Sequence, residues 1–226
     1  MNIALYGSGE FTDSVNEIDR YLIEKYKLKT VAVIPTAAGK ERDYHKWIDM
    51  AQSHYANFKI NVVPVPVINA LDANDSALVK LLDQADWIFF SGGSPKYLLD
   101  TLKDSKLWDK VIQRVNEGAL LAGSSAGAMI MGNYLLESPF KAVFSSLPAN
   151  WDKAFKLVDF TVFPHFNKLK KYNKVISKVI KKAPPEVRNS WIGIEENTAL
   201  IIDSGGSRIK GVGTVDIQSQ EVSLIE

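Results

Sequence analysis

Near the middle of the chain an apolar run is followed by a run of small residues, and a serine lies at the boundary between the two. The stretch GSSAG, residues 123–127, fits the pattern Gly-x-Ser-x-Gly of a nucleophile elbow, in which a serine occupies a sharp strand-to-helix turn. Glycines relieve the crowding that strained backbone at such a turn creates. Ser125 is therefore the candidate nucleophile. The alternative is that these small residues only allow a strand to pack closely against a helix.

A serine hydroxyl needs a neighbouring base before it becomes a useful nucleophile. The chain has three histidines, His45, His54 and His165. His165 follows the apolar run 157–163, so it is expected at the end of a strand, as Ser125 is. The other two fall in an amphipathic stretch, where a surface position is the ordinary expectation. We predict that His165 is the general base, a role that typically contributes ~10²–10⁴-fold in rate.

A glycine pair follows another apolar run, in the stretch FFSGGSP, residues 89–95. Glycines after a strand let backbone N–H groups turn toward a site. The N–H of Gly93, together with that of Ala126 beside the nucleophile, would form an oxyanion hole, and each such donor is worth roughly 10²–10³ in rate. The alternative is an ordinary turn made of permissive residues.

The elements that must position these residues alternate along the chain. Short, nearly continuous apolar runs predict strands at Asn2–Gly7, Thr30–Thr36, Ile60–Val65, Asp86–Gly92, Ala119–Gly123 and Leu157–Phe163. Between and after them, amphipathic stretches predict helices at Asp13–Tyr26, Glu41–Ala56, Asp72–Gln84, Pro95–Glu117 in one or two pieces, and Asn167–Lys182. Asn74 and Asp75-Ser76 offer a helix start. The tail segments TALIID, SRIKGVG and TVDIQ, separated by glycines, suggest hairpins.

Strands that alternate with helices predict an α/β fold with a doubly wound, mostly parallel sheet and a C-terminal β-hairpin region. No linker or repeat divides the chain, so residues 1–226 are expected to form a single domain. Ligands of such sheets bind outside the carboxyl ends of the strands. Three polar stretches stand there: GSGEF after the first strand, SGGSP after the fourth and GSSAG after the fifth.

Taken in order, these stretches resemble the serine peptidases of the dipeptidase E and cyanophycinase family. The likeness runs through GSGEF, VIPTAAG, FSGGSPKYLL, GSSAGAMIMG and FPHF, and continues into WIGIEENTALIID and KGVGTVDI. It implies a flavodoxin-like sheet related to the class I glutamine amidotransferases, with serine in place of their cysteine. It also implies Ser125 as nucleophile, His165 as base, Gly93 and Ala126 as the oxyanion hole, and a pocket lined by residues 7–11. Gly9, Gly92 and Ser94 are the predicted substrate-binding residues.

The chain departs from that family at several positions. Ser94 stands where members usually have asparagine, and Phe163 stands where cyanophycinases have an aspartate. Lysines 170, 171 and 174 stand in the helix where cyanophycinases place arginines. In the family the third triad member is an Asp or Glu between the serine and the histidine. The candidates here are Glu137, Asp152 and Asp159, of which Glu137 lies nearest the expected place, and a Ser–His dyad remains open.

Composition limits the other function classes. The formal net charge is +1, and the lysines of 167–182 alternate with apolar residues as on a solvated helix face, so no nucleic-acid partner is expected. GSGEFT lacks the third glycine of a dinucleotide-binding loop, since Thr12 stands there. With no cysteine and three scattered histidines we expect no metal and no cofactor. No apolar segment is long enough for a membrane span, and the start MNIALYGSGEF lacks signal-peptide features, so a cytoplasmic protein is expected.

The sequence thus predicts a serine hydrolase that cleaves the peptide bond of short peptides, including dipeptides with an acidic N-terminal residue, as a monomer or homodimer. Two alternatives stay open. One is an esterase or amidase that acts on a small non-peptide, and the other is a non-catalytic member of the fold that binds a ligand in the same pocket.

Overall fold

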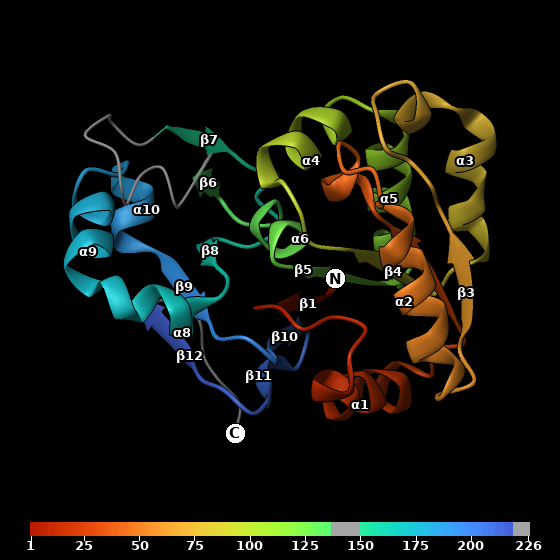
Figure 1. Ribbon diagram of the computed structural model, residues 1–226, viewed down its shortest axis with the longest axis horizontal. Coiled ribbons are helices and arrows are strands. Elements are labelled where there is room, and N and C mark those ends of the chain that lie inside the picture. Colours follow the sequence, from red (N-terminus) through yellow and green to blue (C-terminus); the bar gives the residue numbers. More distant parts are fainter. Residues whose placement is uncertain (137–149, 219–226) are drawn as a thin grey trace.

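A computed structural model describes residues 1–136 and 150–218, with the side chains of 173–176 left undescribed. Its centre is a seven-stranded sheet in the order β11-β10-β1-β5-β4-β2-β3 (Figure 1). The five parallel strands are β1 (Asn2–Tyr6), β2 (Thr30–Ile34), β3 (Asn61–Pro64), β4 (Trp87–Phe90) and β5 (Leu120–Ser124). The antiparallel edge is the hairpin of β10 (Thr198–Asp203) and β11 (Gly206–Gly211).

Helices cover both faces of this sheet. One face carries α1 (Asn16–Tyr26) and α2 (His45–Ala56), which bury Ile18, Leu22, Ala51 and Tyr55 against the strands. The other carries α3 (Ser76–Lys80), α4 (Pro95–Leu102), α5 (Lys106–Asn116) and the short α6 (Ala126–Met129). The strands are apolar at nearly every position because both faces are buried, as parallel sheets require.

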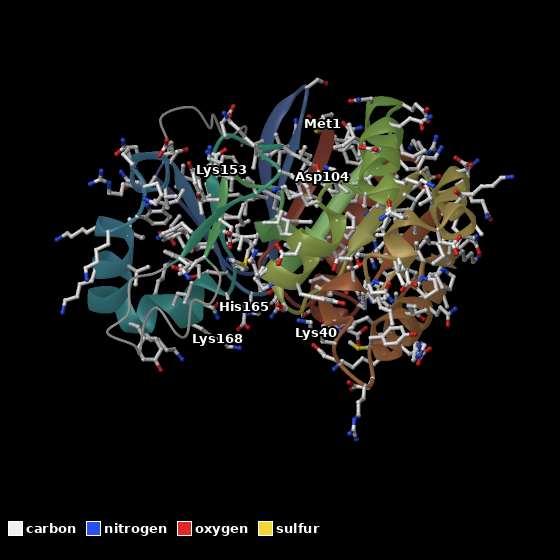
Figure 2. All side chains as sticks on the ribbon, turned by 90° about the horizontal axis from the view of Figure 1, so that it is seen from above. Met1, Lys40, Asp104, Lys153, His165 and Lys168 are labelled. Carbon is white, nitrogen blue, oxygen red and sulfur yellow. The ribbon has the colours of Figure 1, made fainter. Side chains whose placement is uncertain are left out.

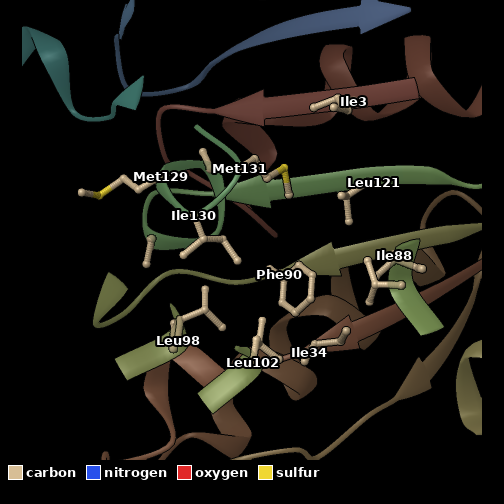
Figure 3. Close-up of a cluster of buried hydrophobic side chains, with 14 of the residues drawn as sticks. Ile3, Ile34, Ile88, Phe90, Leu98, Leu102, Leu121, Met129, Ile130 and Met131 are labelled. Carbon is tan, nitrogen blue, oxygen red and sulfur yellow. The ribbon is translucent and has the colours of Figure 1, made fainter. Parts of the chain in front are cut away.

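Alternate residues of the strands supply the two cores. On the side of α3–α6 the labelled residues in Figure 3 interdigitate across the sheet and helices: Ile3, Ile34, Ile88, Phe90, Leu98, Leu102, Leu121, Met129, Ile130 and Met131. Their neighbours Ala4, Tyr6, Val31, Val33 and Phe89 point to the opposite face. This period of two is the ordinary geometry of a strand.

A second, three-stranded sheet lies beside the first, in the order β12-β9-β8. It consists of β8 (Thr161–Phe163), β9 (Trp191–Ile194) and β12 (Val215–Gln218), with β8 and β9 parallel. Helices α8 (Phe166–Leu169), α9 (Asn173–Lys181) and α10 (Pro185–Asn189) lie with it, at the left of Figure 1. Val162, Ile192 and Ile194 join the main core, whereas Phe163, Phe166 and Val187 form a separate small cluster.

The fold class expected from the sequence is confirmed. The helix start at Asp75 is also confirmed, because its carboxyl accepts the Ala77 N–H at 2.7 Å. Pro95–Glu117 forms two helices, and the predicted helix 167–182 is broken into α8, a 3₁₀ turn (Lys170–Tyr172) and α9.

Other segments differ from the sequence expectation. TVDIQ pairs with β9 rather than forming a hairpin with β11. β9 and the small pair β6 (Tyr134–Leu136) with β7 (Trp151–Lys153) were not predicted as strands. Of the strand expected over 157–163, only Thr161–Phe163 is a strand in the structure, and this is β8.

Candidate active site

Ser125 stands between the end of β5 and the start of α6, on strained backbone. Its φ of 50° and ψ of −107° place it outside the regions that residues with a side chain ordinarily adopt. The strain is held by a hydrogen bond from the Ser125 N–H to the carbonyl oxygen of Tyr6, at 3.1 Å. Close packing explains the flanking glycine, because a Cβ on Gly127 would lie 2.4 Å from the Phe90 carbonyl oxygen. Ser125 therefore lies in a tight, strained turn between a strand and a helix.

His165 lies within hydrogen-bonding distance of this serine. The Ser125 Oγ is 3.0 Å from His165 Nε2, and the other ring nitrogen, Nδ1, is 2.8 Å from Glu196 Oε1. The backbone of His165 is left-handed, with φ of 52°, and its N–H donates to the Gly7 carbonyl oxygen at 3.2 Å. Serine, histidine and carboxylate thus form one continuous chain of side-chain contacts.

Glu196 is held in its charged form. Burial disfavours that form, but it is outweighed by hydrogen bonds from Lys168, His165 and Asn167, which lower the Glu196 pKa to about 2. Lys168 Nζ lies 2.7 Å from Oε1, and Asn167 Nδ2 lies 3.2 Å from Oε2. An ionised carboxylate only accepts hydrogen bonds, so His165 Nδ1 must carry the proton. In the neutral imidazole, Nε2 then has the lone pair that can accept the Ser125 hydroxyl proton.

The second sheet explains why His165 and Glu196 meet. β8 and β9 are parallel neighbours, so their carboxyl ends lie side by side. His165 comes two residues after the end of β8, and Glu196 two residues after the end of β9. Sequence reasoning missed Glu196 because it sought the acid between the serine and the histidine. The acidic pair directly after the apolar run WIGI was the available signal.

The predicted oxyanion-hole residues have N–H groups without a protein acceptor within the described residues. Gly93 follows β4 with φ of +143°, and Ala126 is the first residue of α6. A Cβ on Gly93 would lie 2.5 Å from the backbone carbonyl of Ala37, so only glycine fits there.

The three predicted substrate-binding residues occupy different surroundings. Gly92 lies beside the nucleophile, since a Cβ on it would be 3.5 Å from Ser125 Cβ. Ser94 caps α4, and its hydroxyl accepts the Tyr97 N–H at 3.3 Å. Gly9 makes room for Asn197, whose Oδ1 would be 2.2 Å from a Cβ on it. Their part in substrate binding stays a prediction.

The three carboxylates considered from the sequence have different outcomes. Glu137 lies outside the described residues. Asp152 on β7 is 3.8 Å from Lys96 Nζ, and Asp159 pairs with Lys156 at 3.7 Å on the exposed surface. In the described part of the chain, the carboxylate that contacts His165 is Glu196.

Residues 1–136 and 150–218 contain no cluster of three side chains that could hold a metal ion. No helix in these ranges is long and apolar enough to cross a bilayer.

A mostly parallel α/β sheet with a serine in a strained strand-to-helix turn, next to a His–Glu pair, is an arrangement typical of serine hydrolases. Residues 3–210 match peptidase family S51, and the chain belongs to that family. It is a serine-type peptidase.

Several relatives are named as peptidases. An uncharacterised peptidase of Listeria innocua is 29% identical over 67% of this chain and 71% of its own length. Peptidase E of Haemophilus influenzae is 27% identical over 62% of this chain, and cyanophycinase of a Nostoc species is 30% identical over 63%. The chain spans only 57% and 48% of those two proteins.

Among solved structures, a peptidase from an acI-B1 Actinobacterium superposes with a TM-score of 0.83 at 30% identity. The superposition covers 96% of this chain and 90% of the other. A putative peptidase E from Listeria monocytogenes has a TM-score of 0.66 at 19% identity, over 94% and 98% of the two chains, which supports the fold alone.

Proposed function

We propose that this protein hydrolyses the peptide bond of short peptides through an acyl-enzyme on Ser125. The observation that carries the proposal is the unbroken chain of contacts Ser125–His165–Glu196, at 3.0 and 2.8 Å. A serine hydroxyl at this distance from an imidazole acceptor can lose its proton as it attacks. Glu196 takes the place of the acid for which Glu137 was the leading candidate.

The reaction divides the roles among few groups. His165 Nε2 takes the Ser125 proton while Oγ bonds to the scissile carbonyl carbon, and the N–H groups of Gly93 and Ala126 stabilise the resulting oxyanion. The imidazolium then protonates the leaving amine, and the C–N bond breaks. Water attacks the acyl-enzyme by the same steps and restores the serine. Glu196 orients the ring and stabilises its positive charge.

Positive charge near the site supports a substrate with a carboxylate. Lys168 is 62% exposed and lies beside Glu196, and Figure 2 places it with His165 and Lys40 along one edge of the molecule. Lys40 is exposed and follows the turn whose Ala37 contacts Gly93. Lys170 is held by two carboxylates, Glu195 and Asp216, whereas Lys168 pairs with Glu196. We therefore propose short peptides with an acidic N-terminal residue, in a monomeric or homodimeric cytoplasmic enzyme.

Labelling with a fluorophosphonate tests the chemistry. We expect the wild type to be labelled and Ser125→Ala to stay unlabelled, while Ser124→Ala, the matched neighbour, keeps its label. A folded wild type that resists labelling would favour a ligand-binding protein. Hydrolysis of a dipeptide library, compared with p-nitrophenyl esters, tests the substrate. Turnover of the esters alone would contradict the peptidase proposal and favour an esterase.

A further inference from the structure

A buried glutamate stands next to the nucleophile and takes no part in the Ser–His–Glu chain. Glu10 belongs to the stretch GSGEF after β1 and is only 5% exposed. Burying a carboxyl group is costly unless hydrogen bonds compensate for its lost hydration. The partners of Glu10 are therefore informative about what it does.

Each carboxyl oxygen of Glu10 accepts a hydrogen bond from one side of the active site. Oε1 accepts the Gly92 N–H at 2.9 Å, and Oε2 accepts the Ser124 hydroxyl at 2.5 Å. Gly92 directly precedes the oxyanion-hole residue Gly93, and Ser124 directly precedes the nucleophile. The side chain thus bridges the glycine loop after β4 and the end of β5.

The bridge fixes the peptide that carries the Gly93 N–H. On one side the Gly92 N–H is held by Glu10, and on the other the Ser94 N–H donates to the Ala37 carbonyl oxygen at 2.8 Å. The Gly93 N–H between them has no protein acceptor within residues 1–136 and 150–218. With both neighbouring amides held, the loop offers its middle N–H to a substrate.

Glycine at position 92 is what lets Glu10 approach so closely. A Cβ there would lie 2.9 Å from Glu10 Oε1 and 3.5 Å from Ser125 Cβ. The Glu10 carboxyl group therefore packs against the backbone of the glycine loop, close to the nucleophile and shielded from solvent. This placement suits a group that acts on the backbone rather than on the substrate.

We propose that Glu10 is a positioning residue, which holds the oxyanion-binding N–H of Gly93 in register with Ser125 through its bond to the Gly92 N–H. The inference rests on the proposed function, because it assigns Gly93 to the oxyanion hole. Misplacing a catalytic group by about 1 Å costs on the order of 10²-fold. The loss should fall on kcat, because an oxyanion exists only in the transition state and the intermediate.

Two substitutions of similar size separate hydrogen bonding from packing. In Glu10→Gln the side-chain carbonyl accepts the Gly92 N–H, and its NH₂ faces the Ser124 hydroxyl, which can accept as well as donate. In Glu10→Met the volume stays but both acceptors vanish. We expect Glu10→Gln to keep kcat within about threefold, whereas Glu10→Met loses roughly 10–10² in kcat with little change in KM.

The affinity for a peptide trifluoromethyl ketone supplies a readout that packing alone would not move. This inhibitor forms an oxyanion on Ser125, so its Ki should rise in Glu10→Met in parallel with the loss of kcat, while the KM for the matching peptide stays level. Ser124→Ala, which removes one bond of Glu10 but keeps that to Gly92, should stay within about threefold of wild type in both.

Three outcomes would overturn the inference. In the first, Glu10→Met keeps wild-type kcat and inhibitor affinity. In the second, a folded Glu10→Gln with wild-type Tm is as inactive as Glu10→Met, which would make the charge and not the acceptor the essential feature. In the third, Ser124→Ala loses as much as Glu10→Met. If Glu10→Met does not fold, Glu10→Gln and Ser124→Ala are judged against the wild type instead, and a loss of about tenfold or more in kcat in either variant at wild-type Tm overturns the inference. Failure of the proposed function looks different, because wild-type Ser125 would then resist fluorophosphonate.

Discussion

The two sheets contribute different halves of the candidate active site. The seven-stranded sheet carries Ser125 after β5 and the glycine pair after β4, to which we assign the attacking group and an oxyanion donor. The three-stranded sheet carries His165 after β8 and Glu196 after β9, which we propose as the base and the carboxylate that orients it. Catalytic alignment therefore depends on how the sheets are joined.

The join is made by backbone at the end of β1. The Gly7 carbonyl accepts the His165 N–H at 3.2 Å, and the Ser8 carbonyl accepts the Asn197 N–H at 3.1 Å. Glu196 lies in the short segment through which the chain passes from β9 into β10, and so from one sheet to the other. The end of β1 and the stretch after it therefore support both halves of the site.

The largest expected loss of kcat comes from changing Glu196, which lies in the half of the site carried by the three-stranded sheet. Glu196→Gln removes the charge that orients His165, and we expect kcat to fall by about 10²–10⁴-fold, since the loss of such a carboxylate in a triad costs up to about 10⁴. Steady-state kinetics on the best dipeptide measures it. Glu195→Gln is the matched control, because that carboxylate bonds Lys170 and the Thr214 N–H instead. Equal losses in the two variants would argue against a triad role for Glu196.

The main-sheet half should be nearly as sensitive at Gly93. Gly93→Ala forces a Cβ into the Ala37 backbone and displaces the oxyanion donor, so kcat should fall by roughly 10²–10³. Gly118→Ala is the control, because Gly118 also has a positive φ, +108°, but open space around it. That variant should lose about 1–3 kcal/mol of stability and keep its kcat. Full activity of Gly93→Ala would exclude this N–H from the reaction.

A buried contact of the main sheet should affect stability but not chemistry. The Tyr6 hydroxyl donates to Asp19 at 2.5 Å, and His54 Nε2 lies 2.6 Å from the other oxygen of that carboxyl group. Tyr6→Phe leaves the ring in place but removes one donor, so urea unfolding should show a loss of about 1–3 kcal/mol. Activity should change less than threefold, because the backbone carbonyl that holds Ser125 remains. A large loss of kcat in a folded variant would place this network in the mechanism.

The smallest expected effect is on Tm, and it comes from the charge of Lys168 beside Glu196. The Glu196 pKa of about 2 lies below its ordinary 4.5, so the carboxylate stabilises the fold above pH 4.5 and loses this contribution as the pH falls toward 2. Lys168→Met should raise that pKa and lower Tm by at most about 4 °C at neutral pH. The difference from wild type should shrink between pH 4.5 and 2. Lys171→Met, an exposed neighbour, is the control, and a pH-independent difference would contradict the argument.

Local sequence patterns predicted much of this architecture. Apolar runs bounded by glycine or proline placed the five parallel strands to within two residues at each end, because strands buried on both faces must be apolar throughout. The strand-end positions of Ser125 and His165 followed from the same reasoning. β6, β7 and β9 were missed, because they are short and their pairing partners are distant in sequence.

The residues themselves determined that Ser125, Gly93 and His165 would follow the carboxyl ends of strands, since those positions depend on local propensity and spacing. Tertiary structure alone decided which carboxylate reaches His165. Glu196 is 31 residues away along the chain, and only the parallel pairing of β8 with β9 brings the two together. The bridge from Glu10 to Gly92, across 82 residues, has the same origin. Spacing in sequence cannot encode these contacts, because they arise from which strands become neighbours.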